Sequence, residues 1–567
     1  MRQRSLVLIG LLLVAYGYCV QPPGANALSR YDLVLALVDG GTVRIDRYKD
    51  NTIDRAFADG HYYSDKAIGL ALWTAPFYWL LRRLGLPPWP EHDTLYVVHL
   101  FVLWGVALPA AVATALLRGL LQRWGTPAGR ATALAVIYAL GTPAFAFATM
   151  YFGHQAAAAW GIGALAALEW SRGRRGWLAL AGFCAGWAWL TEYLAALIAG
   201  ALALMGSWTW RWRMIWFGLG GLPAVLLQAG YSTLAFGSPL RLGYGFVQEP
   251  QFAGMRQGFF GLTVPQPEAM LALLVGGKGL FATAPVLLLA PLGWWRWWRA
   301  GERARCLLCA GVGVAFWLST SAYYLWSGGW TPGPRFLVPA LPYLFLPLAG
   351  YAGPPGWLAL LGMLAVGQMG LAQVTTLLVS DQRPFPLVEV WLPNALGGRF
   401  IHSLGELATG VTGVWTFLPW LGVLILGGLG LLIAERWPRP TWGVLGLLVA
   451  TLIVLVGLAL QAATQRPRDP VFALDFDPDP AARRLTVTVG VVQGPARNAG
   501  LWVRAVAPDG QTLVEDWVYP LTLGVGESQR LVYPLPAGRR LSQVTVQVFD
   551  WSFGRRLQDL TVVTLGS

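Results

Sequence analysis

The chain of 567 residues has little charge, four cysteines and five histidines. Charged residues make up 12% of the sequence, whereas they make up roughly a quarter of an average soluble globular domain. So little charge excludes an ordinary soluble protein. The net charge of +13 is distributed along the chain and gathers in no single patch. We therefore expect no nucleic-acid partner.

The four cysteines give no sign of a metal site or a disulfide framework. Cys306 and Cys309 have C-x-x-C spacing, but they lie at the start of an apolar run with no histidine or further cysteine nearby. This context favours neither a zinc site nor a redox pair. We interpret the cysteines as packing residues.

Apolar residues are abundant instead. They make up 56% of the chain, which also contains 30 tryptophans. Long apolar runs with short basic connections are typical of a protein that crosses the membrane many times, and tryptophan suits the two membrane interfaces. The composition predicts an α-helical polytopic membrane protein.

A membrane span needs about 20 apolar residues, and basic loops mark the cytoplasmic side. Together these rules predict about 13 transmembrane helices, with the amino terminus inside and the carboxyl terminus outside the cytoplasmic membrane. The first span is residues 6–20 after the basic sequence MRQR. We interpret it as uncleaved, with a signal peptide as the alternative. For residues 67–84 we expect a helix along the outer surface.

The composition divides the chain into a transmembrane domain, residues 1–463, and a second domain, residues 464–567. From Gln465 onward, short alternating stretches are separated by turn sequences such as APDG. About seven strands at this spacing predict an external β-sandwich of immunoglobulin or fibronectin type. Its simplest role is that of a stabilising or docking appendage. Within the first domain we expect three external loops, residues 21–93, 236–268 and 380–410.

The first external loop concentrates acidic, basic and aromatic residues, most densely in HYYSDK, residues 61–66. A long polar loop beside a membrane is more often functional than not. The alternative is a solvated loop whose mixed charges only keep it soluble. Asp46, Asp50 and Asp54 recur every four residues, which on a helix would give one acidic face for a cation. Gly41 and Thr52 argue against one continuous helix there. We expect no metal and no other cofactor.

Two ionisable residues stand apart from this loop. Glu192 lies where two predicted spans turn, and an isolated carboxylate within apolar sequence suggests function by default. A structural pairing with arginine or lysine would explain it equally well. His154 follows the third predicted span, where it either assists a substrate or satisfies a buried turn.

The order of a first span, an acid-rich external loop, a surface helix and many further spans resembles the GT-C superfamily of polyprenyl-phosphate-sugar-dependent glycosyltransferases. The likeness is to bacterial relatives of the protein O-mannosyltransferases and aminoarabinose transferases, which are glycosyltransferase family 39-like. It covers roughly the first 460 residues. The segments that carry it are SRYDLVLALVDGGTVRID (29–46), YYSDKAIG (62–69), ATMYFGHQ (148–155), LTEY (190–193) and GGWTPGPRFLVPALPY (328–343).

The sequence departs from the family pattern at three places. In these transferases an acidic residue taken as the catalytic base stands shortly before the Arg-Tyr pair, where this chain has Asn26-Ala27-Leu28. The second acid of the family is replaced by Gly153-His154, and Ile68 stands where proline is frequent. These departures make a relative that has lost catalysis a real alternative.

The resemblance implies a base for the acceptor hydroxyl and cations for the departing phosphate. The candidates for the base are Asp46, Asp54 and Asp65. Lys66 resembles the lysine that meets the lipid phosphate, with an interfacial cation paired to Asp65 as the alternative. The full set of substrate-binding candidates is Arg30, Tyr63, Lys66, His154, Glu192, Lys278 and Arg335. For Arg335 a salt bridge to loop acids is an equal alternative, and Lys278 either reaches a phosphate or only extends to the membrane surface.

We therefore expect an inverting glycosyltransferase on the outer face of the membrane. Its donor would be a polyprenyl-phosphate sugar and its acceptor an envelope glycan, lipid or protein. The alternative from another class is a transporter or flippase of a lipid-linked substrate. Transporters usually contain internal repeats with broken spans in matching halves, and the sequence has no convincing repeat.

Overall fold

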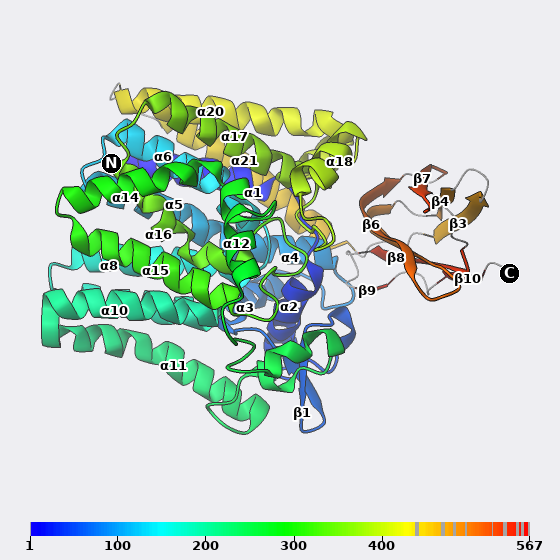
Figure 1. Cartoon of the computed structure of the whole chain (residues 1–567), viewed down its shortest axis with the longest axis horizontal. Helices are drawn as coiled ribbons and strands as arrows, with labels where there is room; N and C mark the ends of the chain where they lie inside the picture. The colour runs from blue at the N-terminus through cyan, green and yellow to red at the C-terminus, as the bar shows by residue number, and fades with distance from the viewer. Residues whose placement is uncertain are drawn as a thin grey trace.

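The computed structural model describes residues 2–436, 442–465, 471–479, 484–493, 496–523, 526–536, 541–550, 555–556 and 561–564. A large helical body is followed by a smaller β region (Figure 1). The helices in the first half of the chain are α1 (Arg2–Gly17), α2 (Gly24–Asp39), α3 (Gly69–Arg83), α4 (Thr94–Val102), α5 (Leu108–Arg123), α6 (Ala128–Leu140), α7 (Pro143–Ala148), α8 (Gly153–Ser171), α9 (Arg175–Thr191), α10 (Ala196–Trp210), α11 (Ile215–Phe236) and α12 (Pro267–Val275). Those that follow are α13 (Leu280–Thr283), α14 (Ala290–Arg299), α15 (Arg303–Ser321), α16 (Leu341–Phe345), α17 (Pro355–Thr375), α18 (Leu392–Leu396), α19 (Leu404–Thr409), α20 (Leu418–Arg436) and α21 (Trp442–Ala463).

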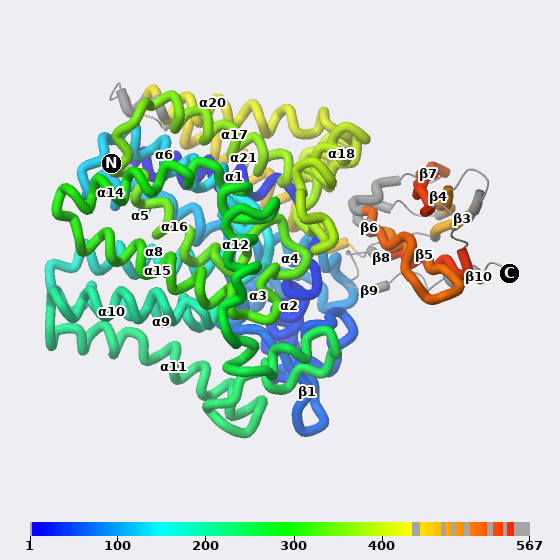
Figure 2. The backbone as a smooth tube through the Cα atoms, viewed as in Figure 1, coloured from blue at the N-terminus to red at the C-terminus, as the bar shows by residue number. Residues whose placement is uncertain are grey.

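The long helices lie side by side with roughly parallel axes, and the β region lies beyond one end of them (Figures 1 and 2). In the described residues, six helical segments are long and apolar enough to cross a membrane, or seven if one bent pair counts as a single span. The six are Thr94–Arg123, Tyr193–Phe236, Arg303–Ser321, Pro355–Thr375, Gly413–Leu431 and Gly443–Ala463. The chain is thus a multi-pass membrane protein by helix length and composition.

The predicted count of 13 spans is not confirmed, because several apolar runs are broken into shorter helices. The run predicted as the third span divides at Gly141 and Thr142 into α6 and the short α7, which begins at Pro143. Proline lacks a backbone donor and fits only the first turn of a helix, so it starts a new helix there. The segments Pro267–Thr283 and Pro285–Arg299 meet at a bend of 105°.

Small residues allow two of the long helices to touch through their backbones. A Cβ atom on Gly182 of α9 would lie 1.8 Å from the carbonyl oxygen of Phe217 in α11, and one on Gly220 would lie 1.9 Å from that of Ala179. Glycine at both positions is therefore required for this approach, as is common between helices in membranes. The tight pairing fixes α9, whose end at Thr191 leads into the candidate site.

The β region consists of two antiparallel sheets. Strands β3 (Val471–Asp479), β4 (Arg484–Gln493) and β7 (Ser528–Pro534) form one sheet in the order β3-β4-β7. The other has the order β10-β8-β5-β6, with β9 also pairing β8. Its strands are β5 (Ala496–Val506), β6 (Thr512–Leu523), β8 (Gln543–Asp550), β9 (Arg555–Arg556) and β10 (Thr561–Thr564).

Alternate residues of the two sheets bury one shared apolar core. Val487 and Val489 of the first sheet pack with Val503 and Val546 of the second. This is the arrangement of a β-sandwich, in which the inward face of each strand is apolar and the outward face is polar. The expected β-sheet region at the carboxyl terminus is therefore present. The end of the last expected strand, beyond Thr564, lies outside the described residues.

Candidate active site

A short hairpin in the first external loop brings two predicted acids together. Strands β1 (Arg55–Ala58) and β2 (His61–Ser64) pair with Arg55 opposite Ser64. Asp59 and Gly60 form the turn, both with positive φ, as the tight hairpin turn with the right twist requires. Because the pairing ends at Arg55 and Ser64, the flanking residues Asp54 and Asp65 come to lie next to each other.

Lys66 holds these two carboxylates. Its Nζ lies 2.9 Å from Asp54 Oδ2 and 2.8 Å from Asp65 Oδ2, and the side chains of all three residues are at least nine-tenths buried. Ser29 of α2 adds a hydrogen bond from its hydroxyl to Asp65 Oδ1 at 3.3 Å. Burial raises the pKa of Asp65, with Lys66 and Arg30 acting in the opposite direction. The cluster is a compact site in which charge is held out of water.

A second cluster forms where the start of α8 meets the end of α9. His154 Nδ1 lies 3.1 Å from Glu192 Oε2. A Cβ atom on Gly153 would lie 2.5 Å from the carbonyl oxygen of Thr191, 3.2 Å from Arg30 Nη2 and 3.5 Å from Glu192 Oε2. Glycine at position 153 therefore lets the Arg30 guanidinium and the Glu192 carboxylate approach the same backbone turn.

The neighbouring groups determine the charge state of Glu192. Burial alone would raise its pKa, but His154, Arg30 and Arg335 lower it by more, so the pKa lies below the usual value. Glu192 is thus an ionised carboxylate in an enclosed place. Arg30 also acts on Asp65, so this guanidinium electrostatically joins the two clusters.

Arg335 is the first residue of the 3₁₀ segment Arg335–Ala340, and its side chain approaches the same region. Its guanidinium lies 4.8 Å from the ring centre of Phe336 and 6.0 Å from that of Phe152. Its Nε atom is buried, and so is that of Arg30, and neither has a hydrogen-bond partner among the described residues. Tyr324 lies within electrostatic reach of Arg335, Asp54 and Asp65. Two guanidinium groups with unused donors therefore border the carboxylates.

An apolar cavity of about 250 Å³ opens beside these charges. Glu192 is the only charged residue in its lining, and most of the remainder is aromatic or aliphatic. The lining includes Tyr193, Leu197, Tyr244, Phe260, Tyr323 and Phe336. Such a cavity suits the apolar part of an amphipathic ligand whose polar end meets the charged groups.

The remaining predicted residues lie in other settings. Asp46 accepts hydrogen bonds from the Tyr62 amide at 2.7 Å and pairs with His61 at 2.8 Å, so it braces the hairpin. Tyr63 is buried and packs its ring on Phe236. Lys278 donates to the carbonyl oxygens of Val379 and Ser380 at 3.0 and 2.9 Å. Asp46 and Lys278 thus have partners other than the residues of the Lys66 cluster.

Sequence reasoning did not identify the tyrosines of the site or the contribution of the second external loop. Gly243 of that loop packs so closely on Asp65 that a Cβ atom would lie 2.8 Å from its Cα. Tyr323 and Tyr324 stand in adjacent positions just before the turn that leads to Arg335. This pair of tyrosines at the end of a predicted span is the sequence feature that could have indicated their place in the site. No group of three or more His, Cys, Asp or Glu residues in the described parts of the chain is arranged to hold a metal.

Comparisons with family models and with curated proteins give no match. Two solved structures are similar to this chain. ArnT from Cupriavidus metallidurans in the apo state matches with 15% identity and a TM-score of 0.38, over 80% of this chain and 74% of that chain. ArnT from Cupriavidus metallidurans bound to undecaprenyl phosphate matches with 16% identity and a TM-score of 0.41, over 81% and 75%.

Proposed function

We propose that this protein is a GT-C-type glycosyltransferase that moves a sugar from a polyprenyl-phosphate donor to an acceptor hydroxyl on the outer face of the membrane. One observation carries the proposal. Glu192 lines the apolar cavity, the guanidinium groups of Arg30 and Arg335 act on Glu192, and Arg30 also acts on the Lys66 cluster that holds Asp54. The required chemistry is a base, cations for a phosphate and an apolar place for a lipid, and each is represented there.

In this proposal the donor phosphate meets Arg30 and Arg335. Guanidinium groups bind phosphate oxygens through paired donors, and the Nε atoms of these two arginines have no partner among the residues that the structure describes. The start of the prenyl chain enters the apolar cavity that Tyr193, Leu197 and Phe260 help to line. Binding then places the sugar between the cavity and the Lys66 cluster.

Asp54 is the proposed base. Asp65 is enclosed completely and is held by both Ser29 and Lys66, whereas the side chain of Asp54 retains 9% of its accessible surface. Asp54 takes the proton as the acceptor oxygen forms its bond to the sugar anomeric carbon. The bond from that carbon to the phosphate oxygen breaks on the opposite face, and the phosphate leaves with both electrons. Lys66 pairs with Asp54 at 2.9 Å and orients its carboxylate, and Arg30 and Arg335 stabilise the charge that develops on the phosphate.

Glu192 and His154 have a positioning role in this scheme. The carboxylate of Glu192 faces the cavity and is paired with His154 at 3.1 Å. It attracts Arg30 and Arg335 toward the same point and offers an acceptor to a sugar hydroxyl. This pair stands where the second acid of the resembling family is missing, so the proposal does not require that acid.

The transporter alternative gains little from the fold. In the described residues only one helix pair is sharply bent, at 105°, whereas transporters with broken spans usually carry them in corresponding positions of two halves. The polar hairpin that builds the Lys66 cluster also has no role in moving a lipid. Transfer therefore explains more of the site than transport does.

The decisive experiment offers a panel of labelled polyprenyl-phosphate sugars to the purified full chain in nanodiscs. Release of free polyprenyl phosphate and the labelled sugar product are both measured. We expect Asp54→Asn to lower kcat by about 100-fold or more with little change in KM, because a general base contributes about that much. The matched control is Asp50→Asn, an exposed carboxylate of the same loop, which should keep the wild-type rate.

Arg335→Gln should instead raise KM for every donor, since it removes a phosphate contact. If no donor turns over while labelled lipid crosses a liposome membrane, the protein is a transporter. If the lipid binds and neither reaction occurs, the protein is an inactive relative.

A further inference from the structure

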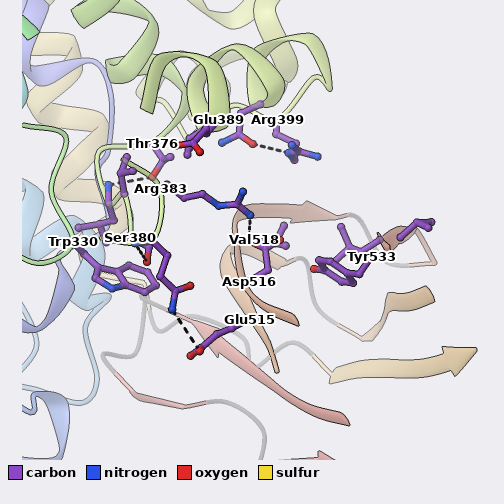
Figure 3. A pocket seen from close by; sticks show the side chains of 18 of the residues that line it. Trp330, Thr376, Ser380, Arg383, Glu389, Arg399, Glu515, Asp516, Val518 and Tyr533 are labelled. Carbon is purple, nitrogen blue, oxygen red and sulfur yellow. Dashed lines mark hydrogen bonds and ion pairs between the residues drawn. The ribbon is translucent and has the colours of Figure 1, made fainter. Parts of the chain in front are cut away.

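A second cavity lies between the helical body and the β-sandwich (Figure 3), and it shares no lining residue with the apolar cavity of the candidate active site. Its volume is about 340 Å³, which falls in the usual range of about 300–1,000 Å³ for small-molecule sites. One wall comes from the third external loop, including Arg383, Glu389 and Arg399. The other wall comes from the sandwich, including Asp516 and Tyr533.

Direct contacts hold the two walls together. Arg383 Nη2 donates to Asp516 Oδ1 at 3.0 Å, and Gln382 Nε2 donates to Glu515 Oε2 at 3.5 Å. Figure 3 shows the Arg383 side chain reaching from the loop toward Asp516 of the sandwich. The cavity therefore exists only while the sandwich is docked, which gives the β-sandwich a function beyond that of an appendage.

The loop wall is rigidly anchored. Lys278 donates to the carbonyl oxygens of Val379 and Ser380, the Thr331 amide donates to Val379 at 3.0 Å, and the Trp391 indole donates to Thr376 at 3.0 Å. Four hydrogen bonds from three donor groups thus fix the backbone of this wall. The wall presents its side chains to the cavity in a preformed arrangement, which lowers the cost of binding a ligand.

The charges in the lining balance. Three arginines stand against three carboxylates: Arg383, Arg399, Arg530, Glu389, Glu515 and Asp516. A site for a phosphate or another anion would carry an excess of positive charge. A site for a lipid chain would lack the charges altogether. Balanced donors and acceptors suit a neutral ligand that carries many hydroxyl groups.

Aromatic side chains complete this chemistry. Trp330 and Tyr533 line the cavity, and such amphipathic rings offer an apolar face next to a polar edge. The hydroxyl of Tyr533 has no hydrogen-bond partner in the part of the chain that is described. A sugar ring has the matching features, with an apolar face of C–H groups and an edge of hydroxyls.

We propose that this cavity binds a neutral glycan, which packs on Trp330 and hydrogen-bonds to the side chains of both walls. Trp330 stands five positions before Arg335 in the same turn, so one short segment contributes to this cavity and to the candidate active site. The bound glycan is the acceptor, or the part of it next to the reacting sugar. Its assignment as acceptor rests on the proposed function, whereas glycan binding does not.

The test presents the full chain, fluorescently labelled in nanodiscs, to an array of neutral and anionic oligosaccharides. Binding of neutral glycans is expected. Arg530→Gln and Tyr533→Phe should each weaken it at least fivefold, since each removes a donor from the wall. Arg504→Gln is the matched control, because Arg504 is an exposed strand arginine like Arg530 but lies outside the cavity. It should bind as the wild type does.

Failure to bind any neutral glycan, binding of anionic glycans alone, or unchanged binding by both cavity variants would overturn the inference. Donor hydrolysis is measured on the same preparations without any glycan. Hydrolysis without glycan binding rejects this site and leaves the proposed function standing. Glycan binding that depends on Arg530 and Tyr533, without donor hydrolysis, supports this glycan site and rejects the proposed transferase function.

Discussion

The ammonium group of Lys66 lies 2.8 Å from a carboxylate oxygen of Asp65, the residue directly before it in the chain. The same ammonium group also neutralises Asp54 at 2.9 Å. One buried cation thus compensates two buried anions, and Arg30 supplies further positive potential from α2. The site depends on this single lysine more than on any one carboxylate.

Lys66→Met should destabilise the protein by about 3–5 kcal/mol, because removing one partner leaves buried charge uncompensated. The measurement is the midpoint of thermal unfolding of the purified protein in detergent. Adding Asp65→Asn to this variant removes one of the two stranded charges and should restore part of the loss. A double variant no more stable than Lys66→Met would contradict the pairing.

Gly153→Ala should lower stability by about 1–3 kcal/mol, as overpacking does in a dense interior. The added methyl group would meet the Thr191 carbonyl oxygen at 2.5 Å and the Arg30 guanidinium at 3.2 Å. Donor turnover should fall as well, since both neighbours belong to the site. The control is Gly200→Ala in α10, where a Cβ atom meets nothing within 4 Å and the thermal midpoint should stay nearly unchanged.

Asp46→Asn should leave donor turnover within about twofold of wild type. The carboxylate of Asp46 is partly exposed and pairs with His61 in the hairpin, and such pairs contribute less than about 1 kcal/mol. Asparagine retains an oxygen that accepts the Tyr62 amide. Parallel assays of Asp46→Asn and Asp54→Asn decide the matter, and a larger loss in the Asp46 variant would make Asp46 the base.

The stability of the protein should depend on pH through His92. Its Nδ1 donates to the Pro87 carbonyl oxygen at 2.9 Å, so its Nε2 accepts the hydroxyl hydrogen of Tyr31 and the ring is neutral. Burial lowers the pKa of His92 from 6.5 to about 4. Unfolding therefore takes up a proton between these two values, and the contribution to stability is complete above pH 6.5 and is lost as the pH falls toward 4.

The expected loss through His92 is roughly 2 kcal/mol at pH 5, from the free energy of about 1.4 kcal/mol per pKa unit. Thermal unfolding measured from pH 7.5 to pH 4.5 tests this. His92→Gln keeps an acceptor for Tyr31 but does not titrate, so its unfolding midpoint should vary less with pH. Equal slopes in both proteins would show that His92 does not cause the dependence.

The strands of the sandwich and the turn between α9 and α10 could be predicted from the sequence, because the alternation of apolar and polar residues and the turn residues act locally. The strands of the sandwich begin within a few residues of the predicted stretches, and the turn of α9 into α10 lies at Thr191 to Tyr193 as predicted. The number of spans could not be predicted. Hydropathy adds apolar residues across a break, whereas Gly141 and Pro143 end one helix and begin another.

The residues of the candidate site could be predicted only in part from the sequence, because their roles depend on contacts that form in the folded chain. Asp46 and Asp54 have the same side chain in the same loop, and only the pairing of β1 with β2 places one of them on Lys66. Lys278 was a candidate phosphate ligand, but its partners are backbone carbonyls about 100 residues later in the chain. Any residue supplies a backbone carbonyl, so no sequence pattern marks such a contact.

The first helix depends on the last one. Helix α1 contacts α5, α20 and α21. The residues after it pair with the third external loop, from the Val20 amide to the His402 carbonyl oxygen and from the Leu404 amide to the Tyr18 carbonyl oxygen, at 3.0 Å each. About 420 residues separate the end of α1 from the start of α21, which a ribosome needs tens of seconds to add. During synthesis α1 therefore stays in the membrane without two of its final neighbours, α20 and α21. A chain stopped before α21 would leave uncovered the side of α1 that packs on α21, however complete the sequence around Lys66 had become.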